Sequence, residues 1–125
     1  MAGSVRLAVD LGTSHTVAVA YLPNQPPRAL LFDGSPLLPS AVFAAVDGTL
    51  HTGNDAQRLA RATPERFEPH PKRRAGDGVV LLGDTAYPVA TLLGAVLRRV
   101  LRVAAEVGVA PTDGVVLTCP ADWGR

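Results

Sequence analysis

Two short runs, at positions 5–9 and 17–21, lie on either side of one small turn, and in each run a large apolar residue or tyrosine recurs at every second position. Alternation with a period of two is typical of β-strands that bury one face, so the two runs predict two strands. Residues 11–14, Leu-Gly-Thr-Ser, separate them and include the small residues that tight turns need. The segment is therefore predicted to be a β-hairpin, with one carboxylate, Asp10, at the end of its first strand.

The predicted turn has the composition of an anion-binding site. Successive backbone N–H groups in a tight turn form a concavity that binds anions. Gly12 would let the backbone approach a ligand closely, while Thr13 and Ser14 add hydroxyl donors. Asp10 would lie where a Mg²⁺ that accompanies phosphates, or one of its waters, needs an oxygen ligand. The alternative is an ordinary hairpin in which Asp10 and Gly12 serve only the geometry of the turn.

Arginine is strongly favoured over lysine in this chain. Eleven of the twelve basic residues are arginine, and Lys72 is the only lysine. A compact ammonium with rotatable donors serves a crowded site that a planar guanidinium cannot. A general preference for arginine, with Lys72-Arg73-Arg74 as a solvated loop, explains the same pattern. Taken alone, the lysine favours the solvated loop.

The remaining pattern predicts a mixed α/β chain. The longest helix is expected at residues 88–107, because apolar residues recur there every three or four positions and Gly108 follows as a stop. Residues 63–78, rich in Pro, Arg and Gly, are expected to form a loop that carries Lys72. The other expected elements are a short helix capped by Asn54 or Asp55, and strands at 4–10, 15–22, 28–32, 40–46, 49–52, 79–82, 85–87 and 115–119.

Composition and charge narrow the class of protein. With 125 residues, of which 47% are hydrophobic and 18% charged, the chain is one domain or part of one and can bury a core. A net charge of +1 argues against nonspecific nucleic-acid binding. The single cysteine, Cys119, suits a reducing cytosol, and neither a membrane span nor a signal peptide is expected. These features predict a soluble cytoplasmic protein without nucleic-acid or membrane partners, and His51, His70 and Cys119 are too scattered for a zinc site.

Three blocks of the sequence, taken in order, resemble one protein family. They are Val9-Asp10-Leu11-Gly12-Thr13-Ser14, then Leu38-Pro39-Ser40-Ala41-Val42 with Gly53-Asn54-Asp55-Ala56 and Lys72-Arg73-Arg74-Ala75-Gly76, and last Leu117-Thr118-Cys119-Pro120-Ala121. In this order and spacing the chain resembles the N-terminal part of the ATPase domain of the 70-kilodalton heat-shock proteins, the DnaK-like branch of the actin-like fold. Sugar kinases and other actin-like ATPases share the first block, whereas the full series is more specific and covers nearly the whole chain.

The resemblance implies an α/β fold, namely a partial actin-like (ribonuclease H-like) ATPase fold with a mixed sheet and a peripheral α/β subdomain. Residues 1–39 and 112–125 would form a partial core subdomain that carries the first phosphate loop. Residues 40–111 would form the peripheral subdomain, with Lys72 and the long helix. The chain would end before the family's second phosphate loop, adenosine pocket and peptide-binding domain.

The resemblance also implies ATP or ADP with Mg²⁺ as cofactors. Asp10 would organise the hydrated Mg²⁺. The residues implied to contact the cofactor are Gly12, Thr13, Ser14 and His15, although many family members carry an aromatic residue where this chain has His15.

The implied catalytic residues are Lys72, Asp10 and Thr13, with Lys72 positioning the attacking water at the γ-phosphate. Phosphoryl transfer depends mostly on positioning and charge neutralisation, for which a carboxylate–metal site and an ammonium are suited. Pro120 would match the proline that relays the nucleotide state toward the peptide-binding domain. The pair Asp122-Trp123 departs from the aromatic pair that commonly follows that proline.

The function expected from the resemblance is ATP binding and hydrolysis in a DnaK-like chaperone, with co-chaperones and client proteins as partners of the full-length parent only. The alternatives are a noncatalytic actin-like or heat-shock-like regulator and, less favoured, a carbohydrate kinase. The chain alone is expected to have little ATPase activity, because catalysis needs both walls of a cleft. It is also expected to self-associate, since the helices that would cover its sheet would lie after Arg125.

Overall fold

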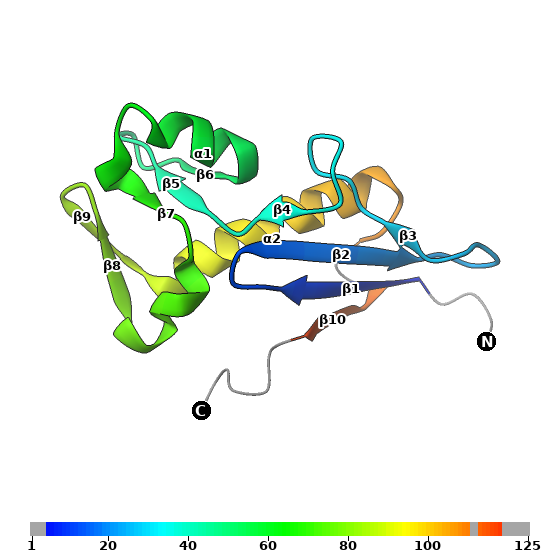
Figure 1. Ribbon diagram of the computed structural model, residues 1–125. Coiled ribbons are helices and arrows are strands. Elements are labelled where there is room, and N and C mark those ends of the chain that lie inside the picture. Colours follow the sequence, from blue (N-terminus) through cyan, green and yellow to red (C-terminus); the bar gives the residue numbers. More distant parts are fainter. Residues whose placement is uncertain (1–4, 111–112, 119–125) are drawn as a thin grey trace.

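The predicted hairpin is formed by β1 (Arg6–Leu11) and β2 (His15–Tyr21), which pair antiparallel with Leu11 opposite Thr16 beside the turn. The computed structural model describes residues 5–110 and 113–118. Strand β10 (Val115–Thr118) lies parallel to β1, while β3 (Arg28–Ala29) and β4 (Leu38–Pro39) pair antiparallel with β2 (Figure 1). The chain therefore has the mixed α/β architecture that the sequence predicts, and its main sheet is mixed, as the resemblance implies.

One face of this sheet is covered by α2 (Val89–Glu106), the predicted long helix (Figure 1). The inward residues of β1, Leu7, Val9 and Leu11, are buried in the same hydrophobic cluster as Val96 and Val100 of α2. The other residues of β1 lie on the opposite face, and Asp10 is exposed there. In β1 the alternation in the sequence thus corresponds to one helix-covered face and one face that α2 does not cover, whereas in β2 it is the small residues Ala18 and Ala20, not Val17 and Val19, that are buried.

The other half of the chain forms two small β units around the first part of α2 (Figure 1). Strands β5 (Val42–Ala44), β6 (Leu50–Thr52) and β7 (Phe67–Glu68) make an antiparallel sheet with the order β6-β5-β7. Helix α1 (Gly53–Ala60) contributes Ala56 to a small cluster with Ala41 and Phe43. Strands β8 (Val79–Leu82) and β9 (Thr85–Pro88) form a hairpin that leads directly into α2.

Residues 63–78 contain more regular structure than the predicted loop. They hold β7 and two 3₁₀ helices, η1 (Pro64–Arg66) and η2 (Pro71–Asp77). Proline occupies the first turn of each, where its missing N–H costs nothing and its fixed φ suits a helix. The prediction of a plain loop was therefore wrong, because Pro64 and Pro71 start short helices here.

Two predicted boundaries also differ. Helix α1 starts directly after β6, with Thr52 rather than Asn54 or Asp55 at its N-cap and no side-chain cap hydrogen bond. The strand expected at 28–32 is shorter in the structure: β3 covers Arg28–Ala29, the Leu30 N–H adds one hydrogen bond to the Ala18 carbonyl oxygen of β2, and the chain then turns back between Phe32 and Ser35, whose backbones bond to each other. Within the described ranges, no helix combines the length and apolarity needed to cross a bilayer.

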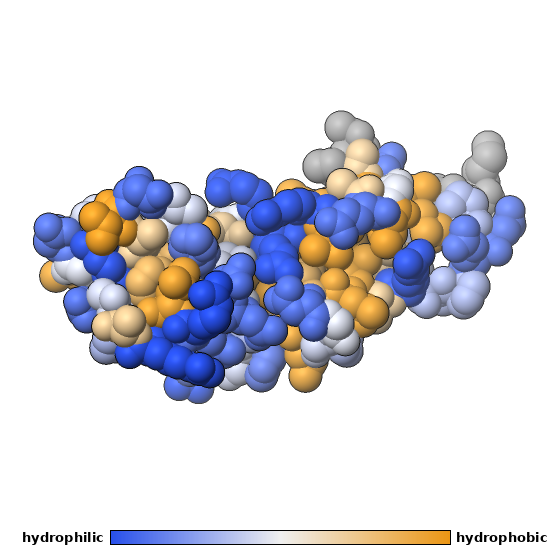
Figure 2. All heavy atoms as spheres, turned by 90° about the horizontal axis from the view of Figure 1, so that it is seen from above, coloured by the Kyte–Doolittle hydropathy of each residue, from blue (hydrophilic) through white to orange (hydrophobic). Residues whose placement is uncertain are grey.

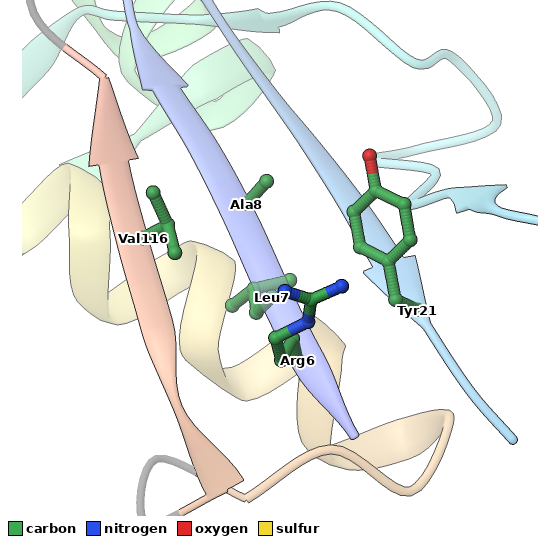
Figure 3. Close-up of a pocket in the computed structure, with 5 residues that line it drawn as sticks. All are labelled: Arg6, Leu7, Ala8, Tyr21 and Val116. Carbon is green, nitrogen blue, oxygen red and sulfur yellow. The ribbon is translucent and has the colours of Figure 1, made fainter. Parts of the chain in front are cut away.

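Apolar surface remains exposed around the sheet. Seen from above, apolar side chains gather over the half of the molecule that holds β3 and the end of α2 (Figure 2). On the edge strand β10, Val115, Val116 and Leu117 are 38%, 55% and 44% exposed. On the face turned away from α2, Val116 and Ala8 line a shallow pocket with Arg6 and Tyr21 (Figure 3). Exposed apolar side chains on an edge strand, whose backbone groups can pair with another strand, favour association with a second chain.

We therefore predict that the 125-residue chain self-associates through the uncovered face and the β10 edge. Sedimentation equilibrium should show an average mass that rises with protein concentration, and Val116→Lys should lower it toward the monomer, because a charge in the middle of the contact is costly to bury. Ala105→Lys, an exposed change on α2, is the control that should leave the association unchanged. A monomer mass at all concentrations for the unchanged chain would rule out self-association.

Candidate functional site

The turn between β1 and β2 depends on glycine for its own geometry. A Cβ added at Gly12 would lie 2.2 Å from the carbonyl oxygen of His15, which is far inside van der Waals contact. The chain therefore returns on itself so closely at this point that only glycine fits. The geometry of the hairpin therefore requires glycine at position 12, whether or not a ligand also approaches the turn closely there.

The far side of the turn is fastened to β4. The backbone N–H of Ser40 donates to the carbonyl oxygen of Ser14 at 2.9 Å, and the hydroxyls of Ser40 and Thr16 lie 2.8 Å apart. Both Thr16 and Ser40 are buried, so each hydroxyl satisfies the other away from water. These contacts hold the start of β2 in place, which is what a preformed ligand turn requires.

Lys72 lies against the near side of the turn. Its Nζ donates a hydrogen bond to the carbonyl oxygen of Leu11, across a sequence separation of 61 residues. Lys72 is 5% exposed, whereas its neighbour Arg73 is exposed. The solvated-loop alternative is therefore wrong for Lys72, because η2 turns this one side chain inward while the arginine beside it faces water.

His70 makes a second contact with the turn. Its ring Nδ1 lies 3.3 Å from the carbonyl oxygen of Thr13, 57 residues away in the sequence. Two carbonyl groups of the turn, those of Leu11 and Thr13, thus accept from two side chains of one segment. The turn and the segment at the start of η2 form one locally packed unit.

Glu68, at the end of β7, anchors this segment. The Glu68 side chain is 7% exposed. Its Oε2 accepts a hydrogen bond from the backbone N–H of His70 at 2.8 Å. Oε1 accepts from Nη1 of Arg74 at 3.2 Å. A buried carboxylate needs such partners, and these two supply them. The Nε of Arg74 also donates to Asp77 at 2.6 Å, and this hydrogen bond raises the pKa of Arg74 above its ordinary value.

The other candidate residues lie around the same turn. Asp10 is exposed at the end of β1, on the face that α2 does not cover, between Val17 of β2 and Thr118 of β10. Gly12 and Thr13 are half-buried, and Ser14 and His15 are exposed. The structure therefore brings Asp10, residues 12–15 and Lys72 to one end of the sheet. Pro120 lies outside the described residues.

The predicted Mg²⁺ would need oxygen ligands, and the side chains of the site can supply only some of them. Among the residues that the structure describes, no group of three His, Cys, Asp or Glu side chains could hold a metal ion. A Mg²⁺ at Asp10 would take its other ligands from waters and phosphate oxygens, which is how Mg²⁺ commonly binds beside nucleotides. An exposed carboxylate at a strand end, beside a turn with two hydroxyls, fits that ligand set.

Sequence reasoning missed Glu68 and His70, because it considered His70 only as a metal ligand. The available signal for His70 was its position between Pro69 and Pro71, which restrict its backbone, and no local signal marked Glu68. The shallow pocket lined by Arg6 and Tyr21 lies at the opposite end of β1 from Asp10 and forms no part of this site. In a comparison with known protein families, none matches the chain.

Proposed function

We propose that Asp10, the turn at residues 11–14 and Lys72 form the phosphate and magnesium half-site of an ATP-binding ATPase domain. The observation that carries the proposal is the hydrogen bond from Lys72 Nζ to the Leu11 carbonyl oxygen. It sets the chain's only lysine, buried, against the turn that the sequence marks as an anion site.

The chemistry of the residues suits a triphosphate. Asp10 would hold a Mg²⁺ through water, and the metal ion would supply charge neutralisation for the phosphate oxygens. Thr13 and Ser14, with the N–H groups of the turn, would donate to the phosphates. The Lys72 ammonium adds positive charge beside the turn and, as the resemblance implies, would orient the attacking water. The hydroxyl–carboxylate–ammonium set thus covers both charge neutralisation and positioning.

The sequence motifs also suggest which part of a larger ATPase this chain would be. The chain would be the N-terminal part of an actin-like ATPase domain of the DnaK-like type, with residues 1–39 and 112–125 in the core subdomain and 40–111 in the peripheral one. The mixed sheet and the α/β unit around residues 42–88 support this arrangement at the level of fold class. A complete protein of this type would couple ATP hydrolysis to a chaperone cycle in the cytoplasm, with co-chaperones and clients as partners.

Paramagnetic Mn²⁺ in place of Mg²⁺ tests the site on the 125-residue chain. With Mn²⁺·ADP, we expect the amide signals of residues 10–14 to broaden first, because the bound metal ion would lie at Asp10. Asp10→Asn should abolish this local broadening while leaving the fold intact, since Asp10 is exposed. Asp47→Asn, which changes an exposed carboxylate in the turn between β5 and β6, is the matched control and should change nothing near the hairpin.

Broadening that persists in Asp10→Asn, or that is centred on other carboxylates, would contradict the proposed metal position. Binding of nucleotide without any effect of the metal ion would favour the noncatalytic regulator. Robust ATP turnover by the pure chain, unaffected by Asp10→Asn, would refute both the role of Asp10 and the half-site.

A further inference from the structure

The contact between His70 and Thr13 defines which ring nitrogen carries the proton. A backbone carbonyl oxygen only accepts hydrogen bonds, so Nδ1, 3.3 Å from the Thr13 oxygen, must be the donor. The neutral ring is then the Nδ1–H tautomer, with Nε2 as the acceptor. His70 is half-buried, so this bond is partly shielded from competing water.

The backbone of His70 is fixed independently of its ring. Its N–H donates to Glu68 Oε2 at 2.8 Å, and the same carboxylate is held by Arg74. Pro69 and Pro71 on either side have fixed φ angles, and a residue before proline is pushed out of the helical region. His70 accordingly has φ −140° and ψ 69° at the start of η2. Its ring therefore points at the turn from a rigid base.

The two contacts with the turn are spaced in the same way on both segments. His70 and Lys72 are two residues apart, and their acceptors, the carbonyls of Thr13 and Leu11, are also two residues apart. A shift of the segment along the turn would therefore disturb both contacts at once. The His70 contact thus limits how far the Lys72 ammonium can move away from the turn.

We infer that His70 is a positioning residue, which holds Lys72 at the phosphate turn by donating from Nδ1 to the Thr13 carbonyl. The inference rests on the proposed function, because the turn at which His70 holds Lys72 is the proposed phosphate half-site. The restraint of the Lys72 ammonium by the His70 ring does not itself depend on a bound nucleotide. In a phosphate site, such a restraint would keep the ammonium preorganised rather than leave it to be ordered during binding.

The single lysine gives a specific measurement. An amine-reactive acetylating reagent modifies Lys72 and the α-amino group only, and mass spectrometry of the peptides separates the two, so the α-amino group is an internal reference. In the unchanged chain, Lys72 should react slowly because it is buried. His70→Ala should raise its rate about five- to tenfold, the equivalent of one lost hydrogen bond.

Two further variants separate positioning from general loosening. His70→Asn should restore most of the protection, because its amide N–H can donate near the place of Nδ1. His51→Ala, at a histidine on β6, should leave the Lys72 rate unchanged. A Lys72 rate within twofold of the unchanged chain in His70→Ala, or equal increases in all three variants, would overturn the inference.

The ring itself provides a test without any substitution. Nitrogen-15 NMR of the unchanged chain should show His70 as the Nδ1–H tautomer, and an Nε2–H tautomer would overturn the inference. None of these measurements contains a nucleotide. Protection of Lys72 by His70 without metal-dependent nucleotide binding would therefore reject the proposed function alone.

Discussion

Lys72→Ala is expected to slow ATP hydrolysis at least about 100-fold in a complete ATPase that contains this sequence, while nucleotide affinity changes less than about tenfold. The reason is that a buried ammonium beside the phosphate turn would act mainly on the attacking water and on the charge that develops during transfer. Lys72→Arg should not rescue the rate, because a planar guanidinium does not fit where a compact ammonium is buried. Single-turnover hydrolysis and equilibrium binding, measured on the same preparations, separate the two effects.

Arg73→Ala is the matched control for Lys72, because it removes one positive charge from the neighbouring exposed position. It should change the hydrolysis rate less than about threefold if screened surface charge contributes little. Equal losses of affinity and rate in Lys72→Ala would indicate simple charge attraction. An unchanged rate would leave Lys72 with a structural role only.

Gly12→Ala is expected to destabilise the 125-residue chain by about 2–4 kcal/mol, because the added methyl group would meet backbone rather than a side chain that can move aside. The 2.2 Å approach to the His15 carbonyl oxygen can be relieved only by opening the turn, which would also displace the carbonyls that accept from Lys72 and His70. The free energy of unfolding from urea titrations, followed by circular dichroism, measures the effect.

Gly76→Ala is the control for this substitution. A Cβ at Gly76 meets nothing within 4 Å, and the residue is exposed. We expect its free energy of unfolding to stay within about 0.5 kcal/mol of the unchanged chain. Equal free energies of unfolding for Gly12→Ala and Gly76→Ala would show that the approach of residue 12 to the His15 carbonyl oxygen does not limit which residue can stand there.

The elements that the sequence predicts well are those whose signal is local and periodic. The helix expected at 88–107 is α2 at Val89–Glu106, and the strand expected at 79–82 is β8 at Val79–Leu82. In α2 the apolar residues recur at helical spacing, and β8 is a short apolar run that ends at a turn with Gly83, so neighbouring residues determine both. The hairpin of β1 and β2 belongs to the same group.

The parts that the sequence does not predict depend on contacts between distant residues. Nothing near Lys72 in the sequence indicates that it is buried, because its partner Leu11 is 61 positions away. The same holds for Glu68, whose burial follows from the pairing of β7 with β5. The start of α1 was misplaced because β6 runs directly into the helix, so Thr52 takes the N-cap that Asn54 or Asp55 was expected to supply.

The most direct test of the central claim is a map of amide chemical-shift changes when the 125-residue chain is titrated with Mg²⁺·ATP. Because only half of a site is proposed, we expect weak binding, with a Kd of about 1 mM, which is about −4 kcal/mol of binding free energy. The largest shifts should fall on residues 10–14 and 70–72, and adenosine without phosphates should not produce them. Shifts that adenosine reproduces, or that centre on the pocket of Arg6 and Tyr21 and leave residues 10–14 unchanged, would contradict a phosphate site at this turn.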